Sequence, residues 1–91
     1  MRLSIIIPIF NATSFLPDLF EALDRNTYET GDEILLVDNG STDNSVELCK
    51  EQVSKRPNLY RLLLFTDRPG SYAARNYGVK QSNGEILVFT D

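Results

Sequence analysis

Three residues that can contact a ligand stand at or just beyond the end of an apolar stretch of the sequence: Phe10, Asp38 and Asp91. The Phe10 ring offers a flat apolar face on which a nucleobase can stack. The Asp38 carboxylate can accept a hydrogen bond from a ring N–H of a base. The Asp91 carboxylate is a hard oxygen ligand of the kind that Mg²⁺ and Mn²⁺ prefer. Together these side chains indicate a site for a nucleotide and a divalent cation.

The segment after Asp38 adds groups that suit the phosphates of such a ligand. Gly40 permits a sharp turn and a close approach of the backbone. Ser41 and Thr42 place hydroxyls at the expected start of a helix. An acidic chain repels a diphosphate, and a divalent cation aided by Arg75 would remove that repulsion.

Four continuous apolar stretches predict the strands that position these residues. None of them alternates polar with apolar residues, which is typical of strands buried on both faces of a parallel sheet. They cover residues 3–10, 34–37, 62–65 and 86–89. In an open parallel sheet, ligands bind beyond the carboxyl ends of the strands. The candidate site residues are therefore expected to meet at one edge of the sheet.

Helical spacing of apolar residues fills the three intervals between these strands. The first helix is predicted over 15–23, with Thr13 or Ser14 as its N-cap. The second is predicted over 44–55, with a cap at 42 or 43 and an inner face formed by Val46, Cys49 and Val53. The third is predicted over 72–81, closed by Asn83-Gly84. The β-α-β-α-β-α-β order predicts an α/β fold, a parallel sheet with helices on both faces.

Composition excludes several classes of function. The 91 residues suffice for one small domain, and the net charge of −4 argues against a nucleic-acid partner and against a polybasic membrane patch. There is no His and a single Cys, so His-based metal sites and internal disulfides are excluded. Dinucleotide and P-loop fingerprints are absent. We expect a cytoplasmic location, with any membrane association supplied by regions outside this chain.

Four segments, in order along nearly the whole chain, resemble motifs of family 2 glycosyltransferases. They are the Pro-x-aromatic-Asn strand end, the Asp-rich loop after the second strand, the Ala-Arg-Asn-x-Gly helix and the strand that leads into Asp-x-Asp. In this sequence they cover residues 4–11, 33–43, 70–78 and 84–91. One such motif alone would be weak evidence for the family, but four of them in the same order are specific to it.

The resemblance implies the Rossmann-like, nucleotide-binding N-terminal half of a GT-A fold. The implied activity is metal-dependent transfer of a sugar, with inversion, from a nucleotide-diphosphate donor such as a UDP-sugar to a glycan, lipid or protein acceptor. By resemblance, the nucleotide-binding residues are Pro8, Phe10, Asp38, Gly40, Arg75 and Asp91. Asp91 would also form part of a site for Mg²⁺ or Mn²⁺.

The sequence departs from the family pattern at three points. Asn39 stands where a second Asp is common, and Phe10 stands where Tyr is frequent. The sequence also reaches only the first acid of Asp-x-Asp, at Asp91. The second acid and the general base are expected beyond this residue, in a longer protein. Loss of a general base typically costs about 10²–10⁴-fold in rate, so we expect residues 1–91 alone to be inactive.

Two further expectations accompany this interpretation. The alternative function is a non-catalytic, regulatory α/β module that binds a nucleotide, and a receiver-like domain is a weaker third. In the isolated chain, the apolar strand over 86–89 would lack the neighbouring element that normally packs against it. We therefore expect self-association through that apolar edge.

Overall fold

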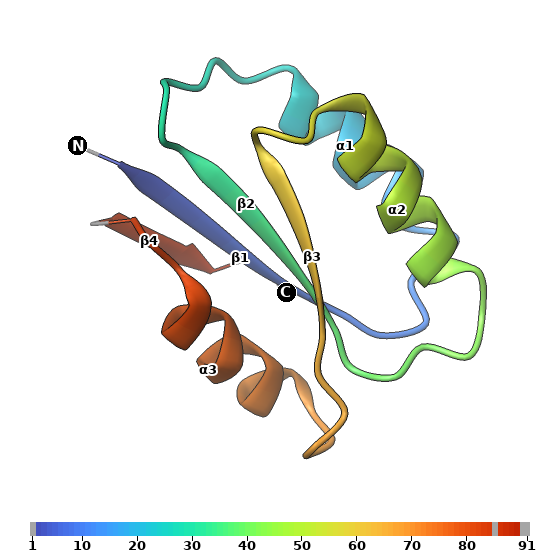
Figure 1. Ribbon diagram of the computed structural model, residues 1–91. Helices are drawn as coiled ribbons and strands as arrows, with labels where there is room; N and C mark the ends of the chain where they lie inside the picture. Colours follow the sequence, from blue (N-terminus) through green and yellow to red (C-terminus); the bar gives the residue numbers. More distant parts are fainter. Residues whose placement is uncertain (1, 85, 90–91) are drawn as a thin grey trace.

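A computed structural model describes residues 2–84 in full and residues 86–89 by their backbone. Strands and helices alternate along the whole described chain (Figure 1). The elements are β1 (Leu3–Ile9), α1 (Leu16–Asp24), β2 (Glu33–Asp38), α2 (Ser45–Lys55), β3 (Tyr60–Leu64), α3 (Ser71–Gln81) and β4 (Ile86–Phe89). This order confirms the predicted succession of elements.

The strands form one parallel sheet in the order β3-β2-β1-β4. β1 lies between β2 and β4, with Ile5 opposite Ile34 on one side and Val88 on the other. Helices α1 and α2 cover one face and α3 covers the other (Figure 1). The predicted Rossmann-like α/β fold class is therefore confirmed, and the carboxyl ends of all four strands share one edge.

Two apolar cores lie on the two faces of the sheet. On the α1–α2 face, Ile5, Ile7 and Ile9 of β1 pack with Leu16 and Phe20 of α1. On the α3 face, Ile6, Leu35 and Val37 of the intervening strand positions pack against Ala74 of α3. Because both faces are covered, β1 and β2 show unbroken apolar stretches rather than alternation.

Gly78 lets α3 lie very close to the sheet. A Cβ built at Gly78 would stand 2.5 Å from Cγ2 of Ile6 and 3.2 Å from Cγ2 of Val37. Normal carbon–carbon contacts are about 3.5–4.0 Å, so any larger residue would collide with the central strands. The small residue is thus required by the packing of α3.

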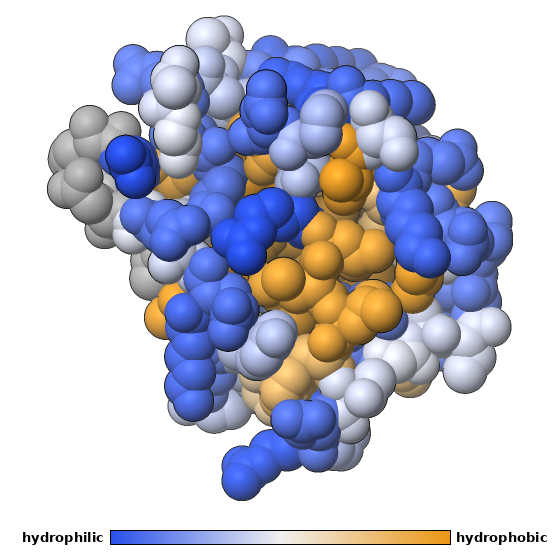
Figure 2. Space-filling view, in the orientation of Figure 1, coloured by the Kyte–Doolittle hydropathy of each residue, from blue (hydrophilic) through white to orange (hydrophobic). Residues whose placement is uncertain are grey.

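The β3 strand forms one edge of the sheet and carries apolar surface. Leu64 is 62% exposed and Leu62 and Leu63 are half-buried. Figure 2 shows an apolar area in the centre of the view, where β3 runs in Figure 1. The predicted self-association concerned the opposite edge, at β4, whose side chains lie outside the described residues.

The boundaries of three strands differ from the prediction. β3 covers Tyr60–Leu64 rather than 62–65, because Tyr60 is buried and its hydroxyl donates to Oδ1 of Asp24 at 2.8 Å. β1 ends at Ile9, before the positive φ of +47° at Asn11, so Phe10 leaves the sheet. β2 is one residue longer at each end than predicted, and β4 has the predicted bounds.

The predicted capping of α1 by Thr13 or Ser14 is wrong. The N-cap is Phe15, which makes no side-chain cap hydrogen bond, and the carbonyl of Ala12 accepts from the N–H groups of Phe15 and Leu16. The N–H of Thr13 donates to the Asp43 carboxylate, and its hydroxyl does not cap the helix.

The ends of α2 and α3 also differ in detail. The N-cap of α2 is Asn44 rather than residue 42 or 43, although Oδ1 of Asp43 accepts the N–H of Ser45 at 2.9 Å. α3 ends at Gln81. The N–H of Asn83 then binds the Glu33 carboxylate, and the next N–H binds the Ser4 hydroxyl. On α2, Cys49 is buried as predicted, whereas positions 46 and 53 are half-buried.

Candidate functional site

The loop after β2 is tied together by the side chain of Asp38. Asp38 is 2% exposed, and its Oδ2 accepts the N–H groups of Gly40 and Ser41 at 3.0 and 2.9 Å. Its Oδ1 accepts the Ser41 hydroxyl at 2.5 Å. Gly40 has a φ of +90°, which disfavours a side chain at this turn. The predicted base-reading acid therefore also builds the loop in which it stands.

Asn11 joins the loop after β1 to the loop after β2. Its Oδ1 accepts the N–H groups of Thr42 and Asp43 at 2.8 and 3.3 Å, and its own N–H donates to the Ser41 hydroxyl at 2.9 Å. Asp43 accepts from Thr13 and Ser45 in turn. Hydrogen bonds from Ser45 and Thr13 lower the pKa of Asp43 to about 2. Asp43 therefore remains ionised at neutral pH and holds the two loops together.

Asn39 joins the loop after β2 to the loop that leads into α3. Its Nδ2 donates to the carbonyl oxygens of Phe65 and Arg68 at 2.7 and 2.8 Å. Its Oδ1 accepts the N–H of Gly70 at 2.7 Å. Its backbone N–H donates to the carbonyl of Ile9 at 2.9 Å. One residue thus connects β1, β2 and the start of α3.

These loops surround a pocket of about 460 Å³ at the carboxyl edge of the sheet. One side is formed by the end of β1 and the other by the start of α3, with Asn39 between them. Phe10 is 61% exposed, so its ring is available to a ligand. The lining residues are Pro8, Ile9, Phe10, Asn39, Pro69, Gly70 and Ser71.

The structure brings part of the predicted site together. Pro8 and Phe10 line the pocket, while Asp38 and Gly40 lie in the adjoining loop without lining it. Arg75 is half-buried on α3, one helical turn after Ser71, and is not among the lining residues. Asp91 lies outside the described residues.

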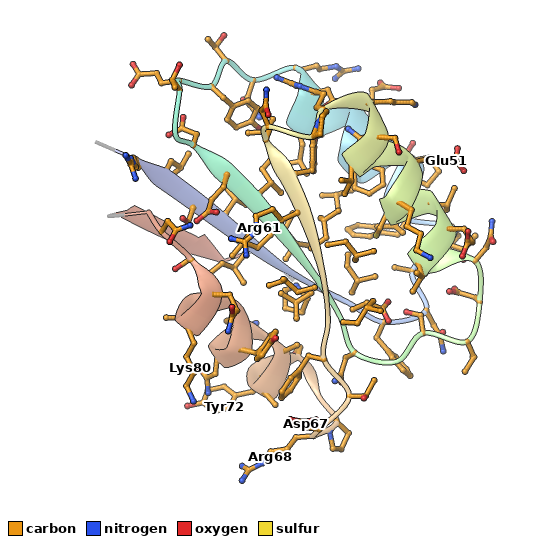
Figure 3. All side chains as sticks on the ribbon, in the orientation of Figure 1. Glu51, Arg61, Asp67, Arg68, Tyr72 and Lys80 are labelled. Atoms are coloured by element: carbon orange, nitrogen blue, oxygen red, sulfur yellow. The ribbon has the colours of Figure 1, made fainter. Side chains whose placement is uncertain are left out.

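Sequence reasoning missed the contribution of the chain segment before α3. Asn39 stood out in the sequence only as a departure from the family's Asp, and no ligand contact was predicted for residues 69–71, yet both line the pocket. The position of Asn39 directly before Gly40 at a strand end was the available signal. Arg68, in the same segment, extends outward from the protein, and Tyr72 and Lys80 lie on the outer side of α3 (Figure 3).

The described residues do not form a metal site by themselves. No group of three or more Asp, Glu, Cys or His side chains gathers within residues 2–84. The carboxylates of Asp38 and Asp43 at this edge already bind N–H groups of the loops. Nor does the described part of the chain contain a helix long and apolar enough to cross a membrane.

The fold and the pocket define a Rossmann-like α/β domain with its candidate site at the carboxyl edge of a parallel sheet. Comparison with known families identifies the domain: the chain belongs to glycosyl transferase family 2, whose model matches residues 4–91. The predicted family is therefore confirmed over nearly the full chain.

Individual relatives agree with this assignment. The glycosyltransferase AglE of Haloferax volcanii is 39% identical over 89 residues, which are 97% of this chain and 29% of AglE. A crystal structure of S. aureus TarS 1–349 matches with a TM-score of 0.85 and 26% identity, over 100% of this chain and 27% of that one. The chain thus spans less than a third of the length of these relatives.

A third similar protein shares the fold. The mannosyltransferase PcManGT of Pyrobaculum calidifontis, solved in complex with GDP-Man and Mn²⁺, matches with a TM-score of 0.84 and 24% identity. The match covers 94% of this chain and 26% of PcManGT. S. aureus TarS 1–349 has also been solved in complex with UDP, and that structure matches with a TM-score of 0.82 and 26% identity over 100% of this chain and 27% of that one.

Proposed function

We propose that this chain is the donor-binding part of a glycosyltransferase that transfers a sugar from a nucleotide-diphosphate donor. The observation that carries the proposal is the pocket beside the exposed Phe10, at the sheet edge where parallel α/β folds bind ligands. Family membership supplies the reaction class.

The lining of the pocket suits a nucleoside better than a purely polar ligand. The ring of Phe10 and the two prolines provide apolar surface against which a base can stack. Gly70 and Ser71 stand at the N-terminus of α3, where backbone N–H groups and the helix dipole favour a phosphate. A nucleotide would thus have its base near β1 and its phosphates toward α3 and Arg75.

The proposed role of Asp38 rests first on the hydrogen bonds by which it holds the loop after β2. A carboxylate has about four lone-pair sites, and three are used by the loop. The fourth remains for a ring N–H of the base, which can reach this 2%-exposed side chain only through a shift of the loop. The UDP complex of TarS supports a uridine nucleotide as the donor carrier.

We further propose that Mg²⁺ or Mn²⁺ neutralises the donor diphosphate, with Asp91 at the ribose or in the metal shell. PcManGT, a protein with the same fold, was solved with Mn²⁺. Among the described residues of this chain, no group of acidic side chains forms another metal site. We also propose that transfer by the intact protein proceeds with inversion.

Nucleotide titration with matched aromatic variants tests the proposal. In the intact protein with Mn²⁺, UDP binding should weaken in Phe10→Ala by roughly fivefold to 150-fold, since stacking on an aromatic ring contributes about 1–3 kcal/mol. Phe15→Ala is the control, because Phe15 is 48% exposed and does not line the pocket. Equal losses in both variants, or no binding by the wild type, would refute the proposed site.

A turnover assay distinguishes a glycosyltransferase from a non-catalytic module that only binds a nucleotide. The intact protein should release the nucleotide from one sugar donor of a UDP- and GDP-sugar panel when Mn²⁺ is present. Tight nucleotide binding without turnover of any donor would favour the non-catalytic module instead.

A further inference from the structure

A buried carboxylate holds the chain between α3 and β4, which we call the α3–β4 link (residues 82–85). Glu33 starts β2 and is 8% exposed. Its Oε2 accepts the hydroxyl of Ser4 at 2.7 Å and the N–H of Asn83 at 2.6 Å. Ser4 is fully buried, and its hydroxyl oxygen accepts the N–H of Gly84 at 2.8 Å. Two successive N–H groups of the link are thus bound to side chains of the central strands, β1 and β2.

Arg61 completes the surroundings of this carboxylate. Its Nη1 donates to Oε1 of Glu33 and to the carbonyl of Gln81, the last residue of α3, each at 3.2 Å. Figure 3 shows Arg61 extending from β3 across the sheet. Burial alone would raise the pKa of Glu33, but its hydrogen bonds, first that from the N–H of Asn83, outweigh burial and lower that pKa below its usual value. Glu33 therefore stays ionised at neutral pH and acts only as an acceptor.

The approach of the α3–β4 link to β1 requires glycine at position 84. A Cβ built at Gly84 would stand 2.2 Å from the Ser4 hydroxyl oxygen and 2.7 Å from the Ser4 backbone nitrogen. Both distances are far shorter than normal contacts, which are about 3.5–4.0 Å between carbon atoms. The link therefore meets β1 at one defined point, two residues before the start of β4.

The apolar pattern of β4 does not by itself define which of its residues pair with β1. Hydrophobic patterning specifies register because a slip of one residue moves every side chain to the other face of the sheet. β4 reads Ile-Leu-Val-Phe, so such a slip only replaces one apolar side chain by another. The bond from Gly84 to Ser4 distinguishes the registers, because it fixes the chain just before the strand. In the observed register Ser4 lies opposite Leu87.

We propose that Glu33 and Ser4 are positioning residues of the metal site, because they fix the register of β4 against β1. Asp91 follows the last residue of β4 by two positions in the sequence, so a change of register moves this acid along the sheet edge. One residue of slip corresponds to about 3.3 Å along a strand, whereas metal–ligand distances hold to about 0.2 Å. The inference rests on the proposed function, which assigns Asp91 to the bound donor and its cation.

UDP binding by the intact protein, with and without Mn²⁺, tests the inference. Glu33→Ala removes the acceptor that holds the link, and Glu33 does not line the pocket. Tyr60→Phe is the matched control, because it also loses a buried hydrogen bond, but on the other face of the sheet, to Asp24. Calorimetry gives the UDP affinities, and hydrogen–deuterium exchange of residues 82–89 reports the order of the link and β4. Circular dichroism confirms that each variant is folded at the assay temperature.

Glu33→Ala should bind UDP with Mn²⁺ roughly tenfold to 100-fold more weakly, as when a group that orients a metal ligand is removed. Its UDP affinity without Mn²⁺ should stay close to that of the wild type, and residues 82–89 should exchange faster. Tyr60→Phe should match the wild type in all three measurements. If Glu33→Ala does not fold, Ser4→Ala, which removes only the hydroxyl that accepts the N–H of Gly84, is measured in its place with the same expectation.

Failure of the inference differs from failure of the proposed function. An unchanged effect of Mn²⁺ on UDP affinity in the folded variant overturns the positioning role, and so do equal losses of affinity with and without Mn²⁺. A wild-type protein that binds UDP no better with Mn²⁺ overturns the proposed metal site, and the role of Glu33 falls with it. A wild-type protein that binds no UDP overturns the proposed function itself.

Discussion

Replacement of Gly78 by Ala tests the packing of α3 because two effects of opposite sign compete. Gly78 lies inside a helix, and Gly→Ala there normally stabilises by about 1 kcal/mol. In this protein, however, the new Cβ would stand 2.5 Å from Cγ2 of Ile6, roughly 1 Å inside normal contact. Ile6 is fully buried in the central strand, so the strain falls in the upper part of the roughly 1–3 kcal/mol range for overpacking.

The net expectation for Gly78→Ala is therefore a loss of about 1–2 kcal/mol in the free energy of unfolding. Urea denaturation measures it, with Asn76→Ala as the control, since this exposed position on the same helix changes helix propensity without touching the sheet. Asn76→Ala should be neutral or slightly stabilising. A Gly78→Ala protein that is more stable than the wild type would refute the close approach of α3 to β1.

Three further predictions concern single side chains. Tyr60→Phe should lower the free energy of unfolding by about 1–2 kcal/mol in urea denaturation, because the buried hydroxyl donates to Asp24; an unchanged midpoint would contradict this bond. Asp43 has a folded pKa of about 2, below its unfolded value, so its stabilisation is present above about pH 4 and is lost as the pH falls toward 2. Asp43→Asn should flatten that part of the stability–pH curve, and an unaltered curve would count against the loop bonds. Burial raises the pKa of the Cys49 thiol to about 12, so iodoacetamide at pH 8 should label it only after unfolding; rapid labelling of the native protein would be inconsistent with its position.

The sequence predicted the order of elements because β1 and β2 are buried on both faces and therefore leave continuous apolar stretches. The shift of β3 escaped prediction because Tyr60 is buried by a partner, Asp24, that lies 36 positions away. The burial of Gln52, which donates to the same Asp24 carboxylate, had the same cause. Such polar contacts between elements far apart in the sequence have no local pattern.

The candidate site was predictable to the extent that it depends on strand ends. Phe10 and Asp38 were found because parallel strands bring their carboxyl ends to one edge. The three hydrogen bonds of the Asn39 carboxamide were not predicted, since their partners belong to another loop and only the folded chain brings them within hydrogen-bond distance. The cap expected at Thr13 was also wrong, because the N–H groups of Phe15 and Leu16 bind the carbonyl of Ala12 instead.

The central claim is that a nucleotide binds with its base against Phe10. The most direct measurement is a nuclear Overhauser experiment on the intact protein with UDP and Mg²⁺, a diamagnetic ion, using selectively labelled phenylalanine. We predict contacts between the base protons of UDP and the ring of Phe10, and their loss in Phe10→Ala. Contacts to a different phenylalanine, or a saturated complex with no contact to Phe10, would contradict the claim.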